Sequence, residues 1–303
     1  MVKKKIRLLY VGLVILLSFS GLLPLAEVEP ALADELEWSI VDTPSEEGGI
    51  VVSPSEINAF VTEGDTFYAI DIPGDPPGGM YPDGKVYKSI DAGVTWEDDL
   101  TEALEDEGAT LPAWDIAVAP DDPELIAVVT DKRQEVYVSE DGGESWENTD
   151  VSSSTGWDSN LLIADIVISA EYGDDNRDIA IGTRNPVSLS NGDIWVIERA
   201  EFLAAWEAQG LDMDVTSIRL SSDYDSDKTI VVVGSDATGT YLCTGIRDTG
   251  ANSTNWAMPY LPKVEISEYS GGSPDKSEII FSDLALPSDY SEDEAESRIV
   301  YAA

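Results

Sequence analysis

The chain has 303 residues, of which 60 are acidic and 17 are basic, so its formal net charge is −43 at pH 7. A surface this acidic repels nucleic acids and anionic lipids, so we exclude nucleic acid as a partner. The chain has no histidine and only one cysteine, which excludes Ser-His-Asp and Cys-His catalysis, histidine-ligated zinc and an internal disulfide.

Residues 1–33 have the form of a secretory signal peptide. A basic start over residues 3–7 precedes an apolar run, and a small-residue pattern follows at 31–33. We predict cleavage after Ala33, a mature domain over 34–303, and secretion or display at the cell surface. An uncleaved membrane anchor is the alternative. No second apolar run is long enough to span a bilayer, so no membrane span is expected after cleavage.

From residue 55 onward, the chain repeats a pattern of short strands. The opening strand of each unit is expected at 55–63, 113–120, 163–170, 215–222 and 281–288. A second strand is expected at 66–71, 125–130, 179–183, 230–235 and 299–303, and a third at 85–90, 135–140, 193–198 and 240–245. A tryptophan closes each complete unit, with a weak fourth strand beside it: Trp96, Trp146, Trp206 and Trp256.

Three or four short strands per unit of roughly fifty residues predict an all-β fold, a β-propeller of four-stranded blades. A single meander exposes two apolar faces, and stacked blades bury both. A β-sandwich is the alternative. We count four complete blades and a partial fifth. Residues 37–41 resemble a fourth strand without its first three, so we expect the parent protein to continue past Ala303.

The third unit departs from this pattern. In place of a tight turn it has the stretch ERAEFLAAWEAQG, residues 198–210, which is rich in strong helix formers. We predict a short inserted helix there, with Phe202, Leu203 and Trp206 on one side and Gly210 as its terminator.

Two turns of the repeat carry the same motif, Ser-x-Asp-x-Gly-x-[Ser/Thr]-Trp. It resembles the Asp-box, or BNR repeat, of the sialidase-like propeller superfamily, and the wider pattern is similar to exported bacterial BNR-like repeat proteins, some from cell-surface layers. Serine and aspartate are expected to bond the turn backbone, glycine to allow positive φ, and tryptophan to pack into the sheets. We predict a structural role, with the aspartates as catalytic acids as the alternative. The motif residues are Ser89, Asp91, Gly93, Thr95, Trp96, Ser139, Asp141, Gly143, Ser145 and Trp146.

The resemblance implies a sialidase site with three arginines, a tyrosine–glutamate pair and an acid aspartate. Only Arg219 lies on an opening strand, and Arg184 heads a loop between second and third strands, so three converging arginines cannot be assembled. We assign no catalytic residue. The long loops carry Tyr81 and Trp157, predicted as exposed aromatics that either bind a ligand or pack their own loops. The ligand-binding candidates are therefore Tyr81, Trp157, Arg184 and Arg219.

These observations favour a non-catalytic binding or structural module at the cell surface. Its expected partner is a cell-wall or surface glycan, or another surface protein. The enzyme alternative is a sialidase-like or other glycoside hydrolase whose site is partly supplied by missing sequence. A third possibility is an assembly factor for a membrane complex, a role that related propellers also fill.

One acidic turn suggests a metal. Asp223, Asp225 and Asp227 alternate like the start of a calcium loop, but Lys228 stands at the sixth position, where such loops need glycine. We favour a solvated strand–turn–strand corner and expect no cofactor, with calcium as the alternative.

Overall fold

A computed structural model describes residues 55–73, 84–96, 98–187, 190–199, 204–256, 263–267, 281–290 and 297–303. Contacts divide the chain into residues 1–40 and 41–303, and every described residue belongs to the second unit. The predicted signal peptide, the predicted strand at 37–41 and Tyr81 lie outside the described residues.

Four antiparallel sheets follow one another along the chain, each with its strands in sequence order. The first contains β1 (Ser55–Glu63), β2 (Thr66–Pro73), β3 (Lys85–Ser89) and β4 (Asp98–Asp99). The second contains β5 (Asp115–Ala119), β6 (Asp122–Thr130), β7 (Glu135–Ser139) and β8 (Glu147–Asn148). The third contains β9 (Leu162–Ile168), β10 (Asp178–Arg184), β11 (Ile194–Glu198) and β12 (Glu207–Ala208).

The fourth sheet contains β13 (Asp214–Leu220), β14 (Thr229–Ser235), β15 (Thr240–Asp248) and β16 (Ser253–Asn255), and β17 (Val264–Glu265) also pairs with β15. A two-stranded sheet of β18 (Leu284–Ala285) and β19 (Tyr301–Ala302) follows. The predicted opening, second and third strands are therefore present in every complete unit.

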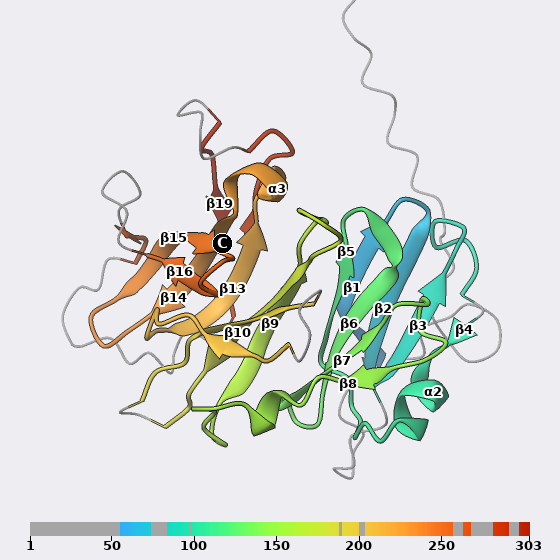
Figure 1. The fold of residues 1–303 in the computed structure, drawn as a ribbon. Coiled ribbons are helices and arrows are strands. Elements are labelled where there is room, and N and C mark those ends of the chain that lie inside the picture. The colour runs from blue at the N-terminus through green and yellow to red at the C-terminus, as the bar shows by residue number, and fades with distance from the viewer. Residues whose placement is uncertain are drawn as a thin grey trace, which may run out of the picture. The chain divides into compact units, whose positions relative to one another are not determined.

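The opening strands lie side by side in chain order. β1 contacts β5, β5 contacts β9, β9 contacts β13, and β13 contacts β18 (Figure 1). Within each four-stranded sheet, the second, third and fourth strands follow in order outward from this inner row of opening strands. Sheets stacked through their first strands are the blades of a β-propeller, so the predicted fold class is confirmed.

The core lies between successive sheets rather than within any one of them. β14 has all seven of its residues buried, because it is covered on both faces by neighbouring sheets. Such strands are near-continuous β-branched runs instead of alternating ones. Fully burying a valine or isoleucine side chain contributes about 1.5–3 kcal/mol. Inter-sheet packing therefore supplies most of the stability of these meanders, which are marginal alone.

Three closing tryptophans reach back to the preceding sheet. Trp146 packs in the cluster between the first and second sheets. Trp206 is buried and donates from its indole Nε1 to Oγ1 of Thr149 in the second sheet's return segment, at 3.1 Å. Trp256 donates from Nε1 to the backbone oxygen of Gln209 in the third unit, at 2.9 Å. In the fourth unit, the tryptophan follows its short strand β16 rather than preceding it.

The predicted helix in the third unit is wrong for its described part. Residues 204–206 are irregular, and β12 then pairs with β11 through Trp195–Ala208 and Val196–Glu207. Phe202 and Leu203 lie outside the described residues. Burial of Trp206 against the preceding sheet fixes an extended backbone here, so tertiary packing overrides helix propensity.

Short helices occur where none was predicted. α2 (Thr101–Asp106) follows β4 and buries Leu104 in the cluster between the first two sheets. A 3-10 turn, η1, covers Val151–Ser153, and α3 (Tyr224–Asp227) occupies the acidic turn after β13. Within the described ranges, no helix has the length and apolar character needed to cross a membrane.

Candidate functional site

Aspartates occupy equivalent repeat positions on three of the inner strands. Asp115 begins β5, Asp165 lies within β9, and Asp283 directly precedes β18, with β13 between β9 and β18. Each carboxylate accepts a hydrogen bond from the backbone N–H of the following residue, at 2.9, 3.0 and 2.8 Å. Such local acceptance orients each of the three side chains in the same way relative to its own backbone.

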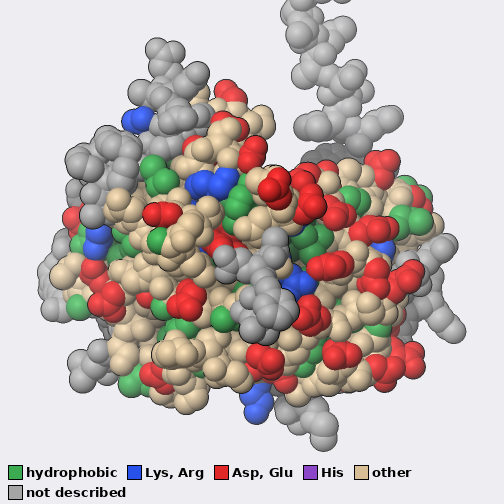
Figure 2. Space-filling view, in the orientation of Figure 1, with side chains coloured by type: hydrophobic (Ala, Val, Ile, Leu, Met, Phe, Trp, Pro, Cys, Tyr) green, Lys and Arg blue, Asp and Glu red, His purple; other side chains and the backbone are tan. Residues whose placement is uncertain are grey.

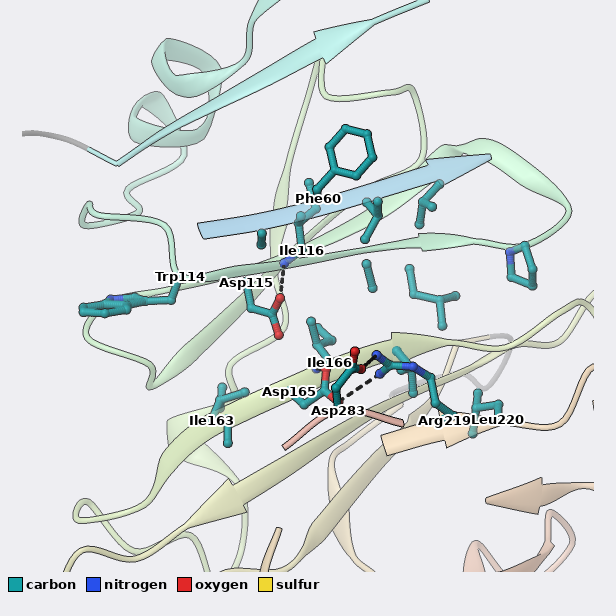
Figure 3. Close-up of a pocket in the computed structure, with 18 of the residues that line it drawn as sticks. Phe60, Trp114, Asp115, Ile116, Ile163, Asp165, Ile166, Arg219, Leu220 and Asp283 are labelled. Carbon is teal, nitrogen blue, oxygen red and sulfur yellow. Dashed lines mark hydrogen bonds and ion pairs between the residues drawn. The ribbon is translucent and has the colours of Figure 1, made fainter. Parts of the chain in front are cut away.

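These strands line a hollow of about 950 Å³, which we call the inner hollow. Its walls are formed by residues of β1, β5, β9 and β13 together with residues 281–283. Figure 3 shows Asp115 extending from β5 toward β9, where Asp165, Asp283 and Arg219 lie together. In the space-filling view, acidic side chains are scattered in patches over the visible face (Figure 2).

Arg219 is tied to two of these carboxylates. Its guanidinium lies 3.1 Å from Oδ2 of Asp165 and 2.9 Å from Oδ1 of Asp283. Asp165 also accepts the backbone N–H of Ile218 at 2.7 Å. The structure therefore places the predicted binding candidate Arg219 in the wall of the hollow, where it links the third, fourth and fifth units as part of an ion-pair chain.

Asp115 has a different environment from Asp165. Burial, reinforced by the negative charge of Asp165, raises the pKa of Asp115 well above its usual range, against the opposing effect of Arg219 and Arg133. Burial also raises the pKa of Asp165, while Arg219 lowers it. Neighbouring carboxyls in a partly dry site favour one retained proton. The pair can therefore hold a proton at a pH where ordinary aspartates are ionised.

Sequence reasoning missed Arg133 and Trp114, which both line the hollow. The guanidinium carbon of Arg133 lies 4.7 Å from the centroid of the Trp114 ring. Arg133 stands in the turn between β6 and β7, in a run of three left-handed residues, 131–133. The expected strands at 125–130 and 135–140 bracket this turn, but Lys132 and Arg133 give no signal of a left-handed conformation, because only Asp131 belongs to the residue types enriched there.

The two Asp-box motifs have matching hydrogen bonds. The hydroxyl of Ser139 donates to Asp141 at 2.7 Å and accepts the N–H of Gly143 at 2.8 Å. Asp141 accepts the N–H and the hydroxyl of Ser145 at 2.9 and 2.6 Å. The first motif repeats these bonds among Ser89, Asp91, Gly93 and Thr95.

Neither Asp-box contributes a residue to the wall of the inner hollow. Trp146 is buried, whereas Trp96 is half-buried and lies 6.4 Å from the ring of Phe60. In both turns, the serine and aspartate side chains form their hydrogen bonds within the turn itself, to its backbone N–H groups and to each other. Their contribution to stability stays a prediction.

The structure does not bring together the three ligand-binding candidates that it describes, Trp157, Arg184 and Arg219. Trp157 was predicted to be exposed and is instead half-buried against the core, with its ring edge-on to Trp195 at 5.2 Å. Its Nε1 donates to Gln134 at 3.4 Å. Arg184 ends β10, beside Arg133 but outside the wall of the hollow. The exposed-aromatic prediction is thus wrong for Trp157, because its loop folds onto the sheet stack.

The predicted calcium residues do not converge. Asp227 is buried and accepts from the hydroxyl of Ser221 at 2.8 Å and the N–H of Thr229 at 2.9 Å, which fixes the corner. Asp225 is exposed and lies beside Lys228. Across the part of the chain that the structure describes, no three carboxylate, cysteine or histidine side chains form a group able to hold a metal.

Comparison of the sequence with protein-family models and with curated proteins finds no match. Solved structures that resemble the fold are β-propeller proteins. A GH74 xyloglucanase from Xanthomonas campestris is 13% identical, with 65% of this chain and 29% of that chain covered and a TM-score of 0.42. YCF48 bound to D1 peptide is 12% identical, with 79% and 62% covered and a TM-score of 0.40.

An α-L-arabinofuranosidase from Clostridium thermocellum is 14% identical, with 69% of this chain and 72% of that chain covered and a TM-score of 0.41. This chain spans about a third of the length of two GH74 structures that it matches, at 29% and 31%. Such likeness concerns the fold alone, so no residue role is transferred from these proteins.

Proposed function

We propose that this chain is a non-catalytic binding module of the propeller type that holds a glycan of the cell surface in its inner hollow. The observation that carries this proposal is the ion-pair chain in the wall. Arg219 forms ion pairs with Asp165 and Asp283, and Asp165 also accepts a hydrogen bond from a backbone N–H. Groups committed in this way hold strands together and are not available as nucleophile or acid.

The rest of the wall suits a glycan. Its volume lies within the range of about 300–1,000 Å³ typical of ligand pockets. Trp114 lies in the wall, and Phe281 has 80% of its surface exposed there. Asn58, which is exposed, and Ser282, whose hydroxyl pairs with that of buried Thr216, add neutral hydrogen-bonding groups of the kind that pair with sugar hydroxyls. Aromatic surface beside neutral polar groups is a common design for binding sugars.

A glycan array of cell-wall and capsular polysaccharides tests this proposal. The variant Ala164→Trp fills the hollow, because Ala164 is a small, half-buried residue of its wall. It should lose binding while remaining folded. Ala251→Trp is the matched control, since Ala251 is exposed in the turn after β15 and does not line the hollow. Equal glycan binding by the wild type and both variants would show that the hollow is not the site.

A second candidate function is glycoside hydrolysis, and one observation favours it. The raised pKa of Asp115 beside Asp165 is the pattern expected of a general acid and its partner. If the chain releases reducing sugar from a bound glycan and Asp115→Asn abolishes this release, the hydrolase reading replaces the non-catalytic one.

We also propose that the protein is exported and that it is an Asp-box propeller. Export is supported by the signal-like sequence of residues 1–33, and sequencing the secreted form should give Asp34 as its first residue. The Asp-box assignment is supported by the matching hydrogen bonds of the two motif turns. Retention of the whole chain in the cytoplasm would contradict the export proposal.

A further inference from the structure

Arg133 has an unusual place among the cations of this chain. Arg177, Arg199, Arg219 and Arg247 each pair with at least one carboxylate, as expected where acidic residues outnumber basic ones by more than three to one. The side chain of Arg133 makes no hydrogen bond or ion pair within the described ranges, although it is half-buried. Its charged head stacks on Trp114 instead.

A second donor lies at the same place. The indole Nε1 of Trp114 is buried and has no acceptor among the described residues. Buried donors are almost always paired in folded proteins, and an orphan requires an explanation such as a ligand. The guanidinium of Arg133 stacks on the ring that carries this donor, so the stacked pair contains two donor groups that have no acceptor among the described residues.

Charges of both signs lie near Arg133. Burial lowers the pKa of its guanidinium most, the Asp115 carboxylate raises it, and the charge of Arg184 lowers it by less. Burial also lowers the pKa of Arg184. The facing carboxyl, Asp115, has a raised pKa and so opposes these cations less than an ordinary aspartate would.

The backbone that presents Arg133 is strained. Asp131, Lys132 and Arg133 have φ values of 53°, 61° and 69°, a left-handed conformation that side chains other than glycine and asparagine rarely adopt. The turn is anchored because the N–H groups of Arg133 and Gln134 both donate to Thr130. Strain of this kind persists where the surrounding structure imposes it, and it gathers at binding sites.

We propose that Arg133, supported by Trp114 and Arg184, forms a subsite for an oxyanionic group of a glycan ligand, either a carboxylate or a sulfate ester. The inference rests on the proposed glycan-binding function. Arginine presents donors in a planar fork that matches both oxyanions. The glycan is preferred over an acidic peptide because Asn58 and Ser282 offer groups for hydroxyls in the same wall.

The overall charge of the chain does not oppose this binding at short range. At physiological salt, the Debye length is about 8 Å, so distant surface carboxylates are largely screened. The contacts of Arg133 with a bound oxyanion are within hydrogen-bonding distance and partly buried, where screening is weak.

Titration calorimetry with matched oligosaccharides tests the subsite on the full chain. The first pair is trigalacturonate and its methyl ester, in which each carboxylate is replaced by a neutral ester that carries one additional methyl group. The second pair is a sulfated carrageenan oligosaccharide and its desulfated form. The wild type should bind the charged member of at least one pair tighter than its neutral member by about ten- to a hundredfold, the range of a charge-assisted hydrogen bond.

The variant Arg133→Met should remove this preference, and Arg133→Lys should retain part of it, because lysine keeps the charge without the fork. Lys132→Met is the matched control, since it removes one positive charge from the same turn at an exposed position. It should leave the preference unchanged. A thermal melt of each variant verifies folding, and Arg133→Lys keeps the test decisive if Arg133→Met is unfolded.

Several outcomes would overturn the inference. These are equal affinity for the members of both pairs, no binding of any of the four sugars, or equal losses in Arg133→Met and Lys132→Met. Tighter binding of a polyglutamate peptide than of either acidic sugar, lost in Arg133→Met, would reassign the subsite to a protein partner. Binding of the neutral sugars alone would refute this subsite while leaving the proposed glycan-binding function intact.

Discussion

Replacing Arg247 by methionine should be among the most destabilising single substitutions in this chain. Arg247 is fully buried between the third and fourth sheets and is held by hydrogen bonds to four side chains. It donates to Asp178 at 3.3 Å, Glu198 at 2.8 Å, Gln209 at 2.8 Å and Asn252 at 2.9 Å. Methionine has a similar length but cannot donate, so Asp178 and Glu198 would both lose the buried cation that pairs with them.

Two tyrosines complete this network. Tyr172 and Tyr224 donate their hydroxyls to the two oxygens of Asp178, at 2.9 and 2.5 Å. Burial and the Asp178 charge raise the pKa of both phenols above the usual range, so both remain donors at any physiological pH. They stabilise the Asp178 carboxylate but supply no positive charge, so they cannot replace Arg247.

The magnitude follows from the cost of leaving a buried charge without its partner. Removing one member of a buried ion pair costs about 3–5 kcal/mol. For a chain of this size, that cost lowers the melting temperature by roughly 10 °C. Arg199→Met is the matched control, because Arg199 pairs with exposed Glu140 and Glu147. Exposed pairs contribute about 0–1 kcal/mol.

Urea unfolding followed by circular dichroism measures both variants. The double variant Arg247→Met/Glu198→Gln should recover part of the lost free energy of unfolding, since it removes one of the two uncompensated charges. An Arg247→Met chain within about 1 kcal/mol of Arg199→Met would refute the claim that this network carries an indispensable countercharge.

Asp141→Ala should lower the free energy of unfolding by about 1–2 kcal/mol, because the turn loses its hydrogen-bond acceptor; an unchanged melting temperature with lost ligand binding would reverse the structural assignment. Hydrogen bonds from Ser145 lower the pKa of Asp141 to about 2, below the unfolded value of 3.8, so its stabilisation should be present above pH 4 and fade between pH 4 and 2 in acid titrations, but not in the alanine variant. Asp115→Asn should raise the melting temperature at pH 7 and not at pH 3, because a carboxyl with a raised folded pKa destabilises the fold once pH exceeds its unfolded pKa; a fall at pH 7 would contradict this. Calcium at millimolar concentration should leave the melting temperature unchanged, and a rise that Asp225→Ala removes would restore the metal hypothesis. Trp157→Ala should lower stability through lost packing on the core, and a fully stable variant would return this residue to the candidate binding surface.

The second strands could be predicted from sequence because their β-branched runs are buried on both faces, as β14 shows. The fourth strands could not be placed well, since β4, β8 and β12 are two residues long and are held mainly by backbone pairing at an outer edge. The helix expected near Trp206 failed because local propensity does not register that its indole is buried in the preceding sheet. α2, by contrast, had a readable helical sequence, TEALED.

The candidate site was only partly predictable. Arg219 could be placed in the wall, because an opening strand must line the inner surface. Asp115 and Asp165 could not be singled out, since nearly every turn of this chain contains carboxylates. The stacking of Arg133 on Trp114 joins a turn to a strand that precedes it by about twenty residues, and only the tertiary structure shows this contact.

The backward reach of Trp146, Trp206 and Trp256 gives the stack a direction. Each of these tryptophans contacts the unit that precedes it in the chain. A unit that folds later therefore docks on a neighbour that is already complete. Units that are added in chain order therefore always meet a neighbour that already carries the surface their tryptophan contacts. If the chain is pulled from its carboxyl-terminal end, the same asymmetry predicts that the units detach one after another, each withdrawing its own tryptophan from the preceding unit.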